Sequence, residues 1–394
     1  MKVVVCGAGI TGLALAGRMA AEGWETVVVE QAPCARPQGY MIDFFGPGFD
    51  AAEAIGLLPR IRELGYHVRE AAYLDARGRR RASLSYERMA GALGGRLVSI
   101  MRPDLERVLR ERLPAGVDLR FGRRLTGIRN GADGVRAILD GGAELSADLL
   151  VGADGIHSTV RRLVFGEEQR YLRYLGFHTA AFTFREPMVH ADVTSQGYRF
   201  CLTDTLGRQM GMYGLRDGRI AVFAVHLAPW PALPDDPQAA LRAEYGQLGW
   251  AIPVALARCP PASEIYYDQV AQVEIPRWSE GRVVLAGDAC HAVSLLAGQG
   301  ASLGIAGACL LARHLSRSAS IGAALASYER LWRPVITDKQ RTGRKLAPWF
   351  VPQARPRLWA RRGALKVASL PVCSRYAAQI ITGKPTQGIA GDFW

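Results

Sequence analysis

The stretch KVVVCGAGITGLALAGRMAAEGWETVVVE, residues 2–30, decides the fold. Its pattern predicts a strand over Lys2–Cys6, a glycine turn, a helix over Leu13–Ala21 and a second strand over Thr26–Glu30. A helix that connects two strands is the βαβ unit of a parallel sheet. The chain is therefore predicted to begin with a Rossmann-type α/β domain.

The glycines of this turn follow the spacing GxGxxG, at Gly7, Gly9 and Gly12. Gly7 permits the turn, Gly9 lets the backbone approach a pyrophosphate, and Gly12 lets helix and strand pack closely. The helix start attracts phosphates. Glu30 ends the next strand, where a carboxylate accepts hydrogen bonds from ribose hydroxyls. The motif predicts a dinucleotide site but does not distinguish FAD from NAD.

A second motif, VGADGIHSTVRRLV at residues 151–164, places Asp154 and Gly155 at the end of a predicted strand. Ser158 is predicted to cap a helix that begins near Thr159. The carboxyl ends of strands in an open α/β sheet face the ligand crevice. Asp154 is therefore either a ligand contact or an ordinary turn residue.

A third motif, GDACHAVSLLAGQG at residues 287–300, follows an apolar strand predicted over Val283–Ala286. Asp288 stands at the strand end, where its carboxylate could hold a polyol chain. Three residues open the next helix: Gly298, Gly300 and Ala301. Such a helix start favours negative charge, such as that on the edge of a reduced flavin. A plain Gly-Asp turn before a buried helix is the alternative.

The composition of the 394 residues, with 49% hydrophobic and 22% charged residues, is that of a globular chain of about two to three domains. No apolar run reaches the roughly 18 residues of a membrane span. The seven cysteines include no CxxC pair, which argues against disulfides or a zinc site. We therefore expect no metal and a reducing, cytoplasmic setting.

The net charge of +13 is concentrated near the C-terminus, since Arg330 to Lys384 holds thirteen Lys and Arg residues against one acid, Asp338. No nucleic-acid module accompanies this charge. It forms either a solvated helix face or a surface for a membrane or partner. We expect no nucleic-acid partner and a monomer or homodimer.

In their order GxGxxG, GADGxxSxVR, GDAxHxxxxxxGxG, the motifs resemble those of the class A flavoprotein monooxygenases. This is the para-hydroxybenzoate hydroxylase-like family, which includes tetracycline-modifying and aromatic polyketide hydroxylases. The resemblance implies non-covalent FAD, with its ADP half at Gly7, Gly9, Gly12 and Glu30. It further implies contacts to FAD or its nicotinamide partner from Asp154 and Gly155, from Asp288 along the ribityl chain, and from Arg102 in RPDLERVL. One position departs from the family pattern, because Leu295 stands where proline is common.

The family's chemistry implies that NAD(P)H reduces the flavin transiently, without a second Rossmann domain. The reduced flavin then traps O₂ as a C4a-hydroperoxide, which hydroxylates an electron-rich aromatic or polyketide-like small molecule. Two alternatives stay open. One is an FAD-dependent reductase of an isoprenoid or other unsaturated substrate, and the other is a flavin-bearing accessory protein that docks through its basic tail.

The predicted domains are discontinuous. An FAD-binding domain is expected over residues 1–70, 96–170 and 274–330, an antiparallel-sheet substrate domain over 71–95 and 171–273, and a basic helical segment over 331–394. A long helix is expected around Phe49–Leu64, a hairpin at Asp217-Gly218, and a C-terminal segment interrupted by Pro334, Pro348, Pro352 and Pro356. The inserted sheet should roof the flavin. The predicted pocket-wall residues are Asp43, His178, Phe182, Tyr213, Phe223 and His226.

Overall fold

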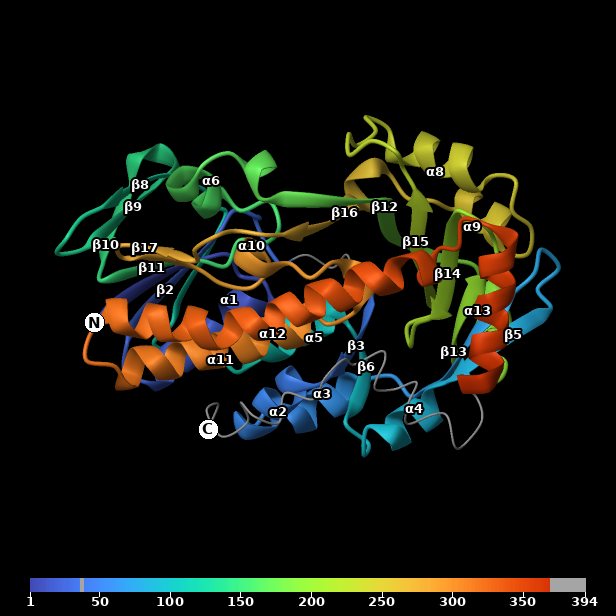
Figure 1. Ribbon diagram of the computed structural model, residues 1–394, viewed down its shortest axis with the longest axis horizontal. Coiled ribbons are helices and arrows are strands. Elements are labelled where there is room, and N and C mark those ends of the chain that lie inside the picture. Colours follow the sequence, from blue (N-terminus) through green and yellow to red (C-terminus); the bar gives the residue numbers. More distant parts are fainter. Residues whose placement is uncertain (36–38, 369–394) are drawn as a thin grey trace.

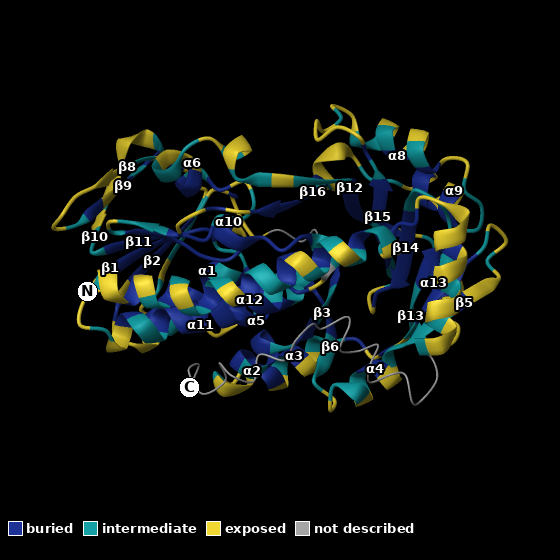
Figure 2. Cartoon of the chain, viewed as in Figure 1, coloured by how far each residue is buried: buried dark blue, intermediate teal, exposed yellow. Residues whose placement is uncertain are grey.

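The computed structural model describes residues 1–35 and 39–368. Two large sheets lie next to each other along the long axis of the molecule (Figure 1). Helix α12 (Ile321–Phe350) runs from beside the first sheet toward the second, where α13 (Arg355–Ala368) turns along the second sheet. The buried residues concentrate in the two sheets and in the helix faces turned toward them (Figure 2).

The first sheet confirms the Rossmann-type opening. Its central strand β1 (Lys2–Cys6) pairs in parallel with β2 (Glu25–Glu30) on one side and β11 (Leu149–Gly152) on the other. The sheet continues through β7 (Asp118–Phe121) next to β2, and through β18 (Val283–Leu285) and the antiparallel β17 (Ser279–Glu280) beyond β11. Helix α1 (Ile10–Ala21) and strand β10 (Glu144–Ala147) of a small antiparallel sheet both contact β1. Its residues Val3 to Cys6 are buried and form a continuous apolar run.

Three helices pack together beside the first sheet. Helix α1 (Ile10–Ala21) packs against β1 and against α11 (Gly300–Arg317), and α5 (Arg102–Glu111) packs against α1. Helix α5 carries a proline in its first turn and buries Leu105, Val108 and Leu109, as its periodicity predicts.

The second sheet has seven strands and lies beside the first along the long axis (Figure 1). Their spatial order is β16 (Tyr266–Val273), β12 (Leu172–Arg185), β15 (Arg219–Leu227), β14 (Arg208–Gly214), β13 (Tyr198–Thr203), β4 (Val68–Leu74) and β5 (Arg80–Ser85). Neighbours pair antiparallel except β13 and β4, which come from distant segments and pair in parallel. The hairpin predicted at Asp217-Gly218 joins β14 to β15, with Gly218 at φ 79°.

Smaller elements complete the fold. Strands β3 (Met41–Phe45) and β6 (Leu97–Met101) form a ribbon, and β8 (Leu125–Asn130), β9 (Val135–Leu139) and β10 (Glu144–Ala147) form a third sheet. The remaining α-helices are α2 (Pro47–Ala54), α3 (Leu58–Leu64), α4 (Tyr86–Ala92), α6 (Thr159–Phe165), α7 (Pro187–Thr194), α8 (Pro237–Tyr245), α9 (Ile252–Ala257) and α10 (Asp288–His291). The 3₁₀ turns are η1 (Asp140–Gly142), η2 (Glu168–Arg170), η3 (Ala262–Glu264) and η4 (Leu295–Ala297).

Two helix predictions were wrong. The single helix expected around Phe49–Leu64 is two helices, α2 and α3, because Gly56 adopts φ 73° between them. The predicted interruption of the C-terminal segment is confirmed only at Pro352, which lies between α12 and α13, since Pro334 and Pro348 lie inside the continuous α12. Proline in a helix interior costs about 3 kcal/mol, but α12 buries large side chains such as Trp332 on α11, which offsets that cost.

Part of the positive charge of the C-terminal helices is paired within the fold. Arg344 pairs with Glu274, and both Arg361 and Arg362 pair with Asp204, which directly follows β13. Residues 369–394 of the predicted basic segment lie outside the described residues. Within the described part of the chain, no helix is long and apolar enough to cross a membrane.

Candidate functional site

The three glycine motifs meet at one edge of the first sheet. Gly7 adopts φ 108°, and a Cβ atom there would lie 2.9 Å from the Cα of Asp154, in the second motif. A Cβ atom at Gly287, in the third motif, would lie 2.9 Å from the Cβ of Thr11, in the first motif. Both distances are too short for a side chain, so these glycines are required by the close approach of segments that lie far apart in the sequence.

The start of α1 is open to a ligand. Gly9 precedes the helix, and no side chain caps its first turn. A Cβ atom at Gly9 would lie 3.7 Å from Glu106 Oε1 and 3.8 Å from an Arg102 guanidinium nitrogen. The free amides at the start of a twelve-residue helix, beside an arginine, form an environment suited to a pyrophosphate.

Glu30 is held against this helix start. Its carboxylate accepts hydrogen bonds from Ala8 N at 2.9 Å and Ala32 N at 2.8 Å. A carboxylate has about four lone-pair sites, so Glu30 keeps acceptor capacity for a ribose diol while its orientation is fixed.

The side chains of Arg102, Asp288 and Tyr40 lie close enough for their charges to interact, and the space beside them is called the recess below. Arg102 pairs with Glu106 at 2.9 Å, and its backbone amide donates to the Tyr40 carbonyl at 3.0 Å. Asp288 is exposed. The surrounding protein nevertheless desolvates its carboxyl and so raises its pKa, whereas the charge of Arg102 lowers it. Burial likewise raises the pKa of Tyr40 to about 12, again against Arg102. An accessible but desolvated carboxylate beside an arginine is typical of a binding recess.

The glycines after Asp288 shape the start of α11. Gly298 adopts φ 64°, and α11 begins at Gly300 without a side-chain cap, followed by Ala301. A Cβ atom at Gly300 would lie 3.7 Å from Asp288 Oδ1. The Asp288 carboxylate therefore lies close to the positive end of an 18-residue helix.

Leu295, the departure from the family pattern, begins η4 just before this loop. Ser294 precedes it with φ 83°, and the Ser294 hydroxyl accepts a hydrogen bond from Leu296 N at 3.2 Å. Leu296 and Phe350 of α12 pack against the same buried cluster, and η4 contacts α12. The turn is therefore built by a serine and anchored on the C-terminal helix.

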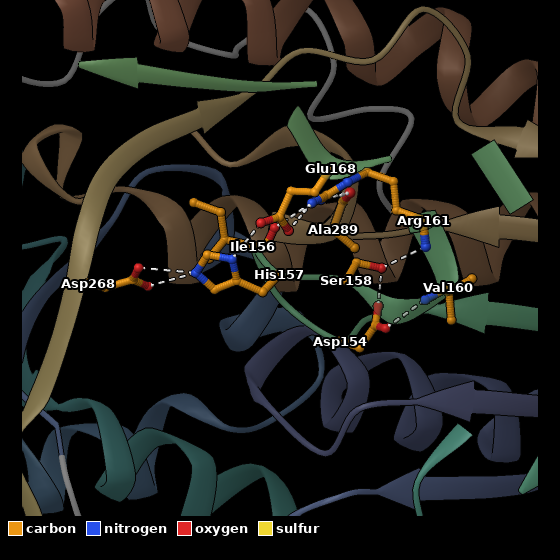
Figure 3. A network of polar contacts seen from close by, with 9 residues as sticks. All are labelled: Asp154, Ile156, His157, Ser158, Val160, Arg161, Glu168, Asp268 and Ala289. Atoms are coloured by element: carbon orange, nitrogen blue, oxygen red, sulfur yellow. Dashed lines mark hydrogen bonds and ion pairs between the residues drawn. The ribbon is translucent and has the colours of Figure 1, made fainter. Parts of the chain in front are cut away.

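The second motif is locked by its own side chains (Figure 3). Asp154 accepts from the Ser158 hydroxyl at 2.5 Å and from Val160 N at 3.0 Å, and Ser158 caps α6 by accepting from Arg161 N, as predicted. Burial raises the pKa of Asp154, and these hydrogen bonds oppose the rise. Gly155 adopts φ 81° with open space around it, so the backbone of this loop remains approachable.

The predicted pocket residues divide between the two faces of the second sheet. Phe223 and Tyr213 face β3 and Tyr40. The rings of Phe223 and Tyr40 lie 5.7 Å apart, and the Tyr213 hydroxyl accepts from Met41 N at 2.5 Å. Asp43 lies on β3 and accepts from the hydroxyls of Tyr86 and Ser99, both at 2.7 Å. Burial raises the pKa of Asp43 against these bonds.

His178, Phe182 and His226 correct the prediction, because they lie on the opposite face. Successive side chains alternate along a strand, and these three even-numbered residues pack toward α8 and α9. His226 contacts the hydroxyls of Tyr245 and Tyr267. Burial lowers the pKa of His178, and that of His226 to about 4. These histidines are core residues.

Two aromatic residues that sequence reasoning missed complete the recess. The rings of Tyr40 and Tyr266 lie 6.1 Å apart, and Tyr266 is 37% exposed. Tyr40 follows the undescribed residues 36–38, and Tyr266 begins an edge strand. Neither position carries a motif, so only the alternation of side chains in β16 could have indicated Tyr266.

The donor set fits FAD. One end offers the open α1 start and Glu30 for a diphosphate and ribose, and the other offers Asp288 and the α11 start for a polyol chain and a ring system that becomes negative. Aromatic side chains adjoin the second end. The residues that surround the recess therefore match the chemistry of both halves of the cofactor.

Comparison with known proteins agrees with this fit. The model of the FAD binding domain family matches residues 1–339. The FAD-dependent monooxygenase asL6 of Sarocladium schorii is 30% identical over 371 residues, which cover 86% of each chain. In fold, the chain is similar to tetracycline destructase Tet(51), with a TM-score of 0.81, 23% identity and 98% of each chain covered. It is also similar to Klebsiella pneumoniae HpxO complexed with FAD and uric acid, with a TM-score of 0.71, 24% identity, and 100% of this chain and 95% of that chain covered. The chain thus belongs to the FAD binding domain family and is an FAD-dependent monooxygenase.

Proposed function

We propose that the protein uses NAD(P)H and O₂ to hydroxylate an electron-rich aromatic or polyketide-like small molecule. The observation that carries the proposal is the ring cluster of Tyr40, Phe223 and Tyr266 beside Arg102 and Asp288. Aromatic side chains bind planar aromatic ligands in offset or edge-to-face contacts, each worth about 0.5 to 1.5 kcal/mol beyond burial. A planar substrate would therefore be held close to the ring end of the cofactor.

The proposed FAD contacts follow the recess from end to end. The ADP half of FAD would contact Gly7, Gly9, Gly12 and Glu30. The cofactor would then pass Arg102 and the loop at Asp154 and Gly155. Its ribityl chain and flavin edge would contact Asp288, Gly298, Gly300 and Ala301. Bound FAD supplies the redox chemistry, since it accepts a hydride from NAD(P)H and passes electrons to O₂. NAD(P)H binds transiently, and the reaction takes place in the cytoplasm.

The side chains of the recess contribute binding, charge and exclusion of water. Tyr213 and Asp43 are both engaged in hydrogen bonds, and His178 and His226 lie behind the sheet. We therefore assign no acid–base catalyst among them. The role of the ring cluster, Tyr40, Phe223 and Tyr266, is to fix the aromatic substrate and keep water from the reacting atoms, which limits the loss of reducing equivalents as hydrogen peroxide.

A panel of phenolic and polyketide-like compounds tests the proposal. FAD-loaded enzyme with NADH or NADPH should consume O₂ in proportion to a product that is heavier by one oxygen atom. Tyr266→Ala should raise KM for that substrate, whereas Tyr266→Phe, which keeps the ring, should not. A substrate that is reduced without O₂ uptake would establish the reductase instead, and turnover of no compound in the panel would contradict the substrate class.

A further inference from the structure

The imidazole of His157 connects the loop at Asp154 and Gly155, called the cofactor loop here, to the seven-stranded sheet (Figure 3). His157 Nε2 lies 3.1 Å from Asp268 Oδ1, and His157 Nδ1 lies 3.0 Å from Glu168 Oε1. His157 follows Gly155 by two residues in the loop between β11 and α6, whereas Asp268 belongs to β16, an edge strand of the seven-stranded sheet. The contact therefore spans the two large sheets.

The Asp268 end of this contact leads to the aromatic cluster. The Tyr266 hydroxyl donates to Asp268 Oδ2 at 3.3 Å, and the two residues lie on the same face of β16. The Tyr266 ring is 6.1 Å from that of Tyr40. A shift of Asp268 would therefore move a ring of the proposed substrate site.

The His157 end is rigid. Arg161 is fully buried and donates to the carbonyls of Ile156 at 2.7 Å and Ala289 at 2.9 Å, and its other contact is Glu168 at 2.9 Å. Ala289 directly follows Asp288. The loop that carries His157 is thus tied to the third motif, so His157 is fixed relative to the proposed flavin contacts.

We propose that His157 is a positioning residue, which sets the spacing between the cofactor loop and the aromatic cluster through its ion pair with Asp268. The inference rests on the proposed function, because it gives the pair a role in aligning the aromatic substrate with the cofactor. Misplacement by about 1 Å can lower turnover by about a hundred-fold.

The charges around His157 favour its cationic form. The hydrogen bond with Asp268, and to a lesser degree Glu168, raises the pKa of His157 to about 9, although partial burial opposes the rise. The ionisable groups around it are Asp268 from β16, Glu168 from η2, and Arg161 from α6, which shares Glu168. Both ring nitrogens donate at neutral pH, and one donor is lost as the pH rises through about 9.

The test compares His157→Gln with His67→Gln, a matched control at a histidine that is 84% exposed. In the FAD-loaded enzyme, His157→Gln should raise KM for the aromatic substrate and lower its turnover by up to about a hundred-fold. It should also raise the share of NAD(P)H oxidation that ends as hydrogen peroxide, with FAD affinity unchanged. Asp268→Asn should act in the same way, and Glu168→Gln should act less because it keeps the Asp268 contact. The share of NAD(P)H oxidation that yields hydroxylated product, called coupling here, should fall in the wild type as the pH rises through about 9. This fall should be absent from His157→Gln.

A second measurement needs no turnover. The ring proton signal of His157, assigned by its loss in His157→Gln, should titrate near pH 9 and shift to lower pH in Asp268→Asn. If this holds but no aromatic compound is hydroxylated, the proposed function fails while the ion pair stands. If hydroxylation occurs and His157→Gln matches His67→Gln in KM and coupling, the positioning role is overturned, as it is if His157 titrates near its ordinary value.

Discussion

The hydroxyl of Thr11 in α1 fills the place that a side chain at Gly304 in α11 would take. The two helices carry the first and third motifs, so this contact fixes their separation. A Cβ atom at Gly304 would overlap Thr11 Oγ1 but would lie 3.6 Å from Thr11 Cβ, an ordinary contact distance. The clash therefore depends on one removable atom.

Gly304→Ala should lower the free energy of unfolding by about 1 to 3 kcal/mol through overpacking. Adding Thr11→Ala should recover most of that loss, because it removes the clashing hydroxyl. Urea denaturation of the two single variants and the double variant gives the coupling energy. Additive losses in the double variant would show that the helices do not meet through Thr11.

Asp288→Ala should weaken FAD binding about 10- to 100-fold, the worth of a hydrogen bond to a charged group, while the stability of the FAD-free protein changes little. Asp154→Ala should do the reverse. Its carboxylate accepts a hydrogen bond from Val160 N at the start of α6, so the variant should lose about 1 kcal/mol of stability and much less FAD affinity than Asp288→Ala loses. Fluorescence titration with FAD and thermal melts measure the two effects, and equal losses of FAD affinity would remove the distinction.

Asp204→Ala should destabilise the fold by about 3 to 5 kcal/mol, because it leaves a buried guanidinium unpaired. Asp204 accepts from Arg361 at 2.8 Å and Arg362 at 2.6 Å, and the side chains of Asp204 and Arg361 are 1% and 5% exposed. The matched control is Asp118→Ala, which breaks the exposed pair with Arg120 and should cost less than about 1 kcal/mol. Similar losses in both variants would show that α13 is not held through Asp204.

Stability should fall on mild acidification. Burial lowers the pKa of both His226 and His291 to about 4. Between the unfolded value near 6.5 and the folded value near 4, the unfolded chain binds more protons. Stability is therefore full above about pH 6.5 and declines as the pH falls toward 4, by on the order of 2 to 3 kcal/mol per histidine.

Denaturation at several pH values measures this slope, and His291→Leu should flatten it. His291 is suited to the substitution because its Nε2 has no hydrogen-bond partner among the described residues. Parallel pH profiles of wild type and variant would contradict a neutral His291.

Much of the fold could be predicted because its signals are local. The alternation of strand, glycine turn and helix in residues 2–30 specifies the βαβ unit, and Ser158 and Asp217-Gly218 specify a cap and a hairpin by their own backbone chemistry. Two helix predictions failed. The periodic pattern over Phe49–Leu64 predicted one helix, but Gly56 divides it into two. Pro334 predicted a break, but tertiary packing keeps α12 continuous through it.

The site was predictable only where a motif carries it. Gly7, Gly9, Gly12, Glu30, Asp154 and Asp288 stand at strand ends that meet in a parallel sheet, so the sequence alone places them at one edge. His178 and His226 were misplaced because the face that a strand residue takes depends on register with its neighbours. Tyr266 was missed for the same reason, and Tyr40 was missed because it lies before β3 in a segment that carries no motif.

The sequence by itself therefore determined the class of fold, the positions of the three motifs and the cofactor that they indicate. Only the tertiary structure decided which side chains share the recess, that Gly287 and Gly304 are needed because Thr11 lies against them, and that His157 reaches Asp268. Local backbone preferences act over a few residues and can be read along the chain. Contacts between residues 111 or more positions apart, such as His157 and Asp268, depend on packing that no local pattern encodes.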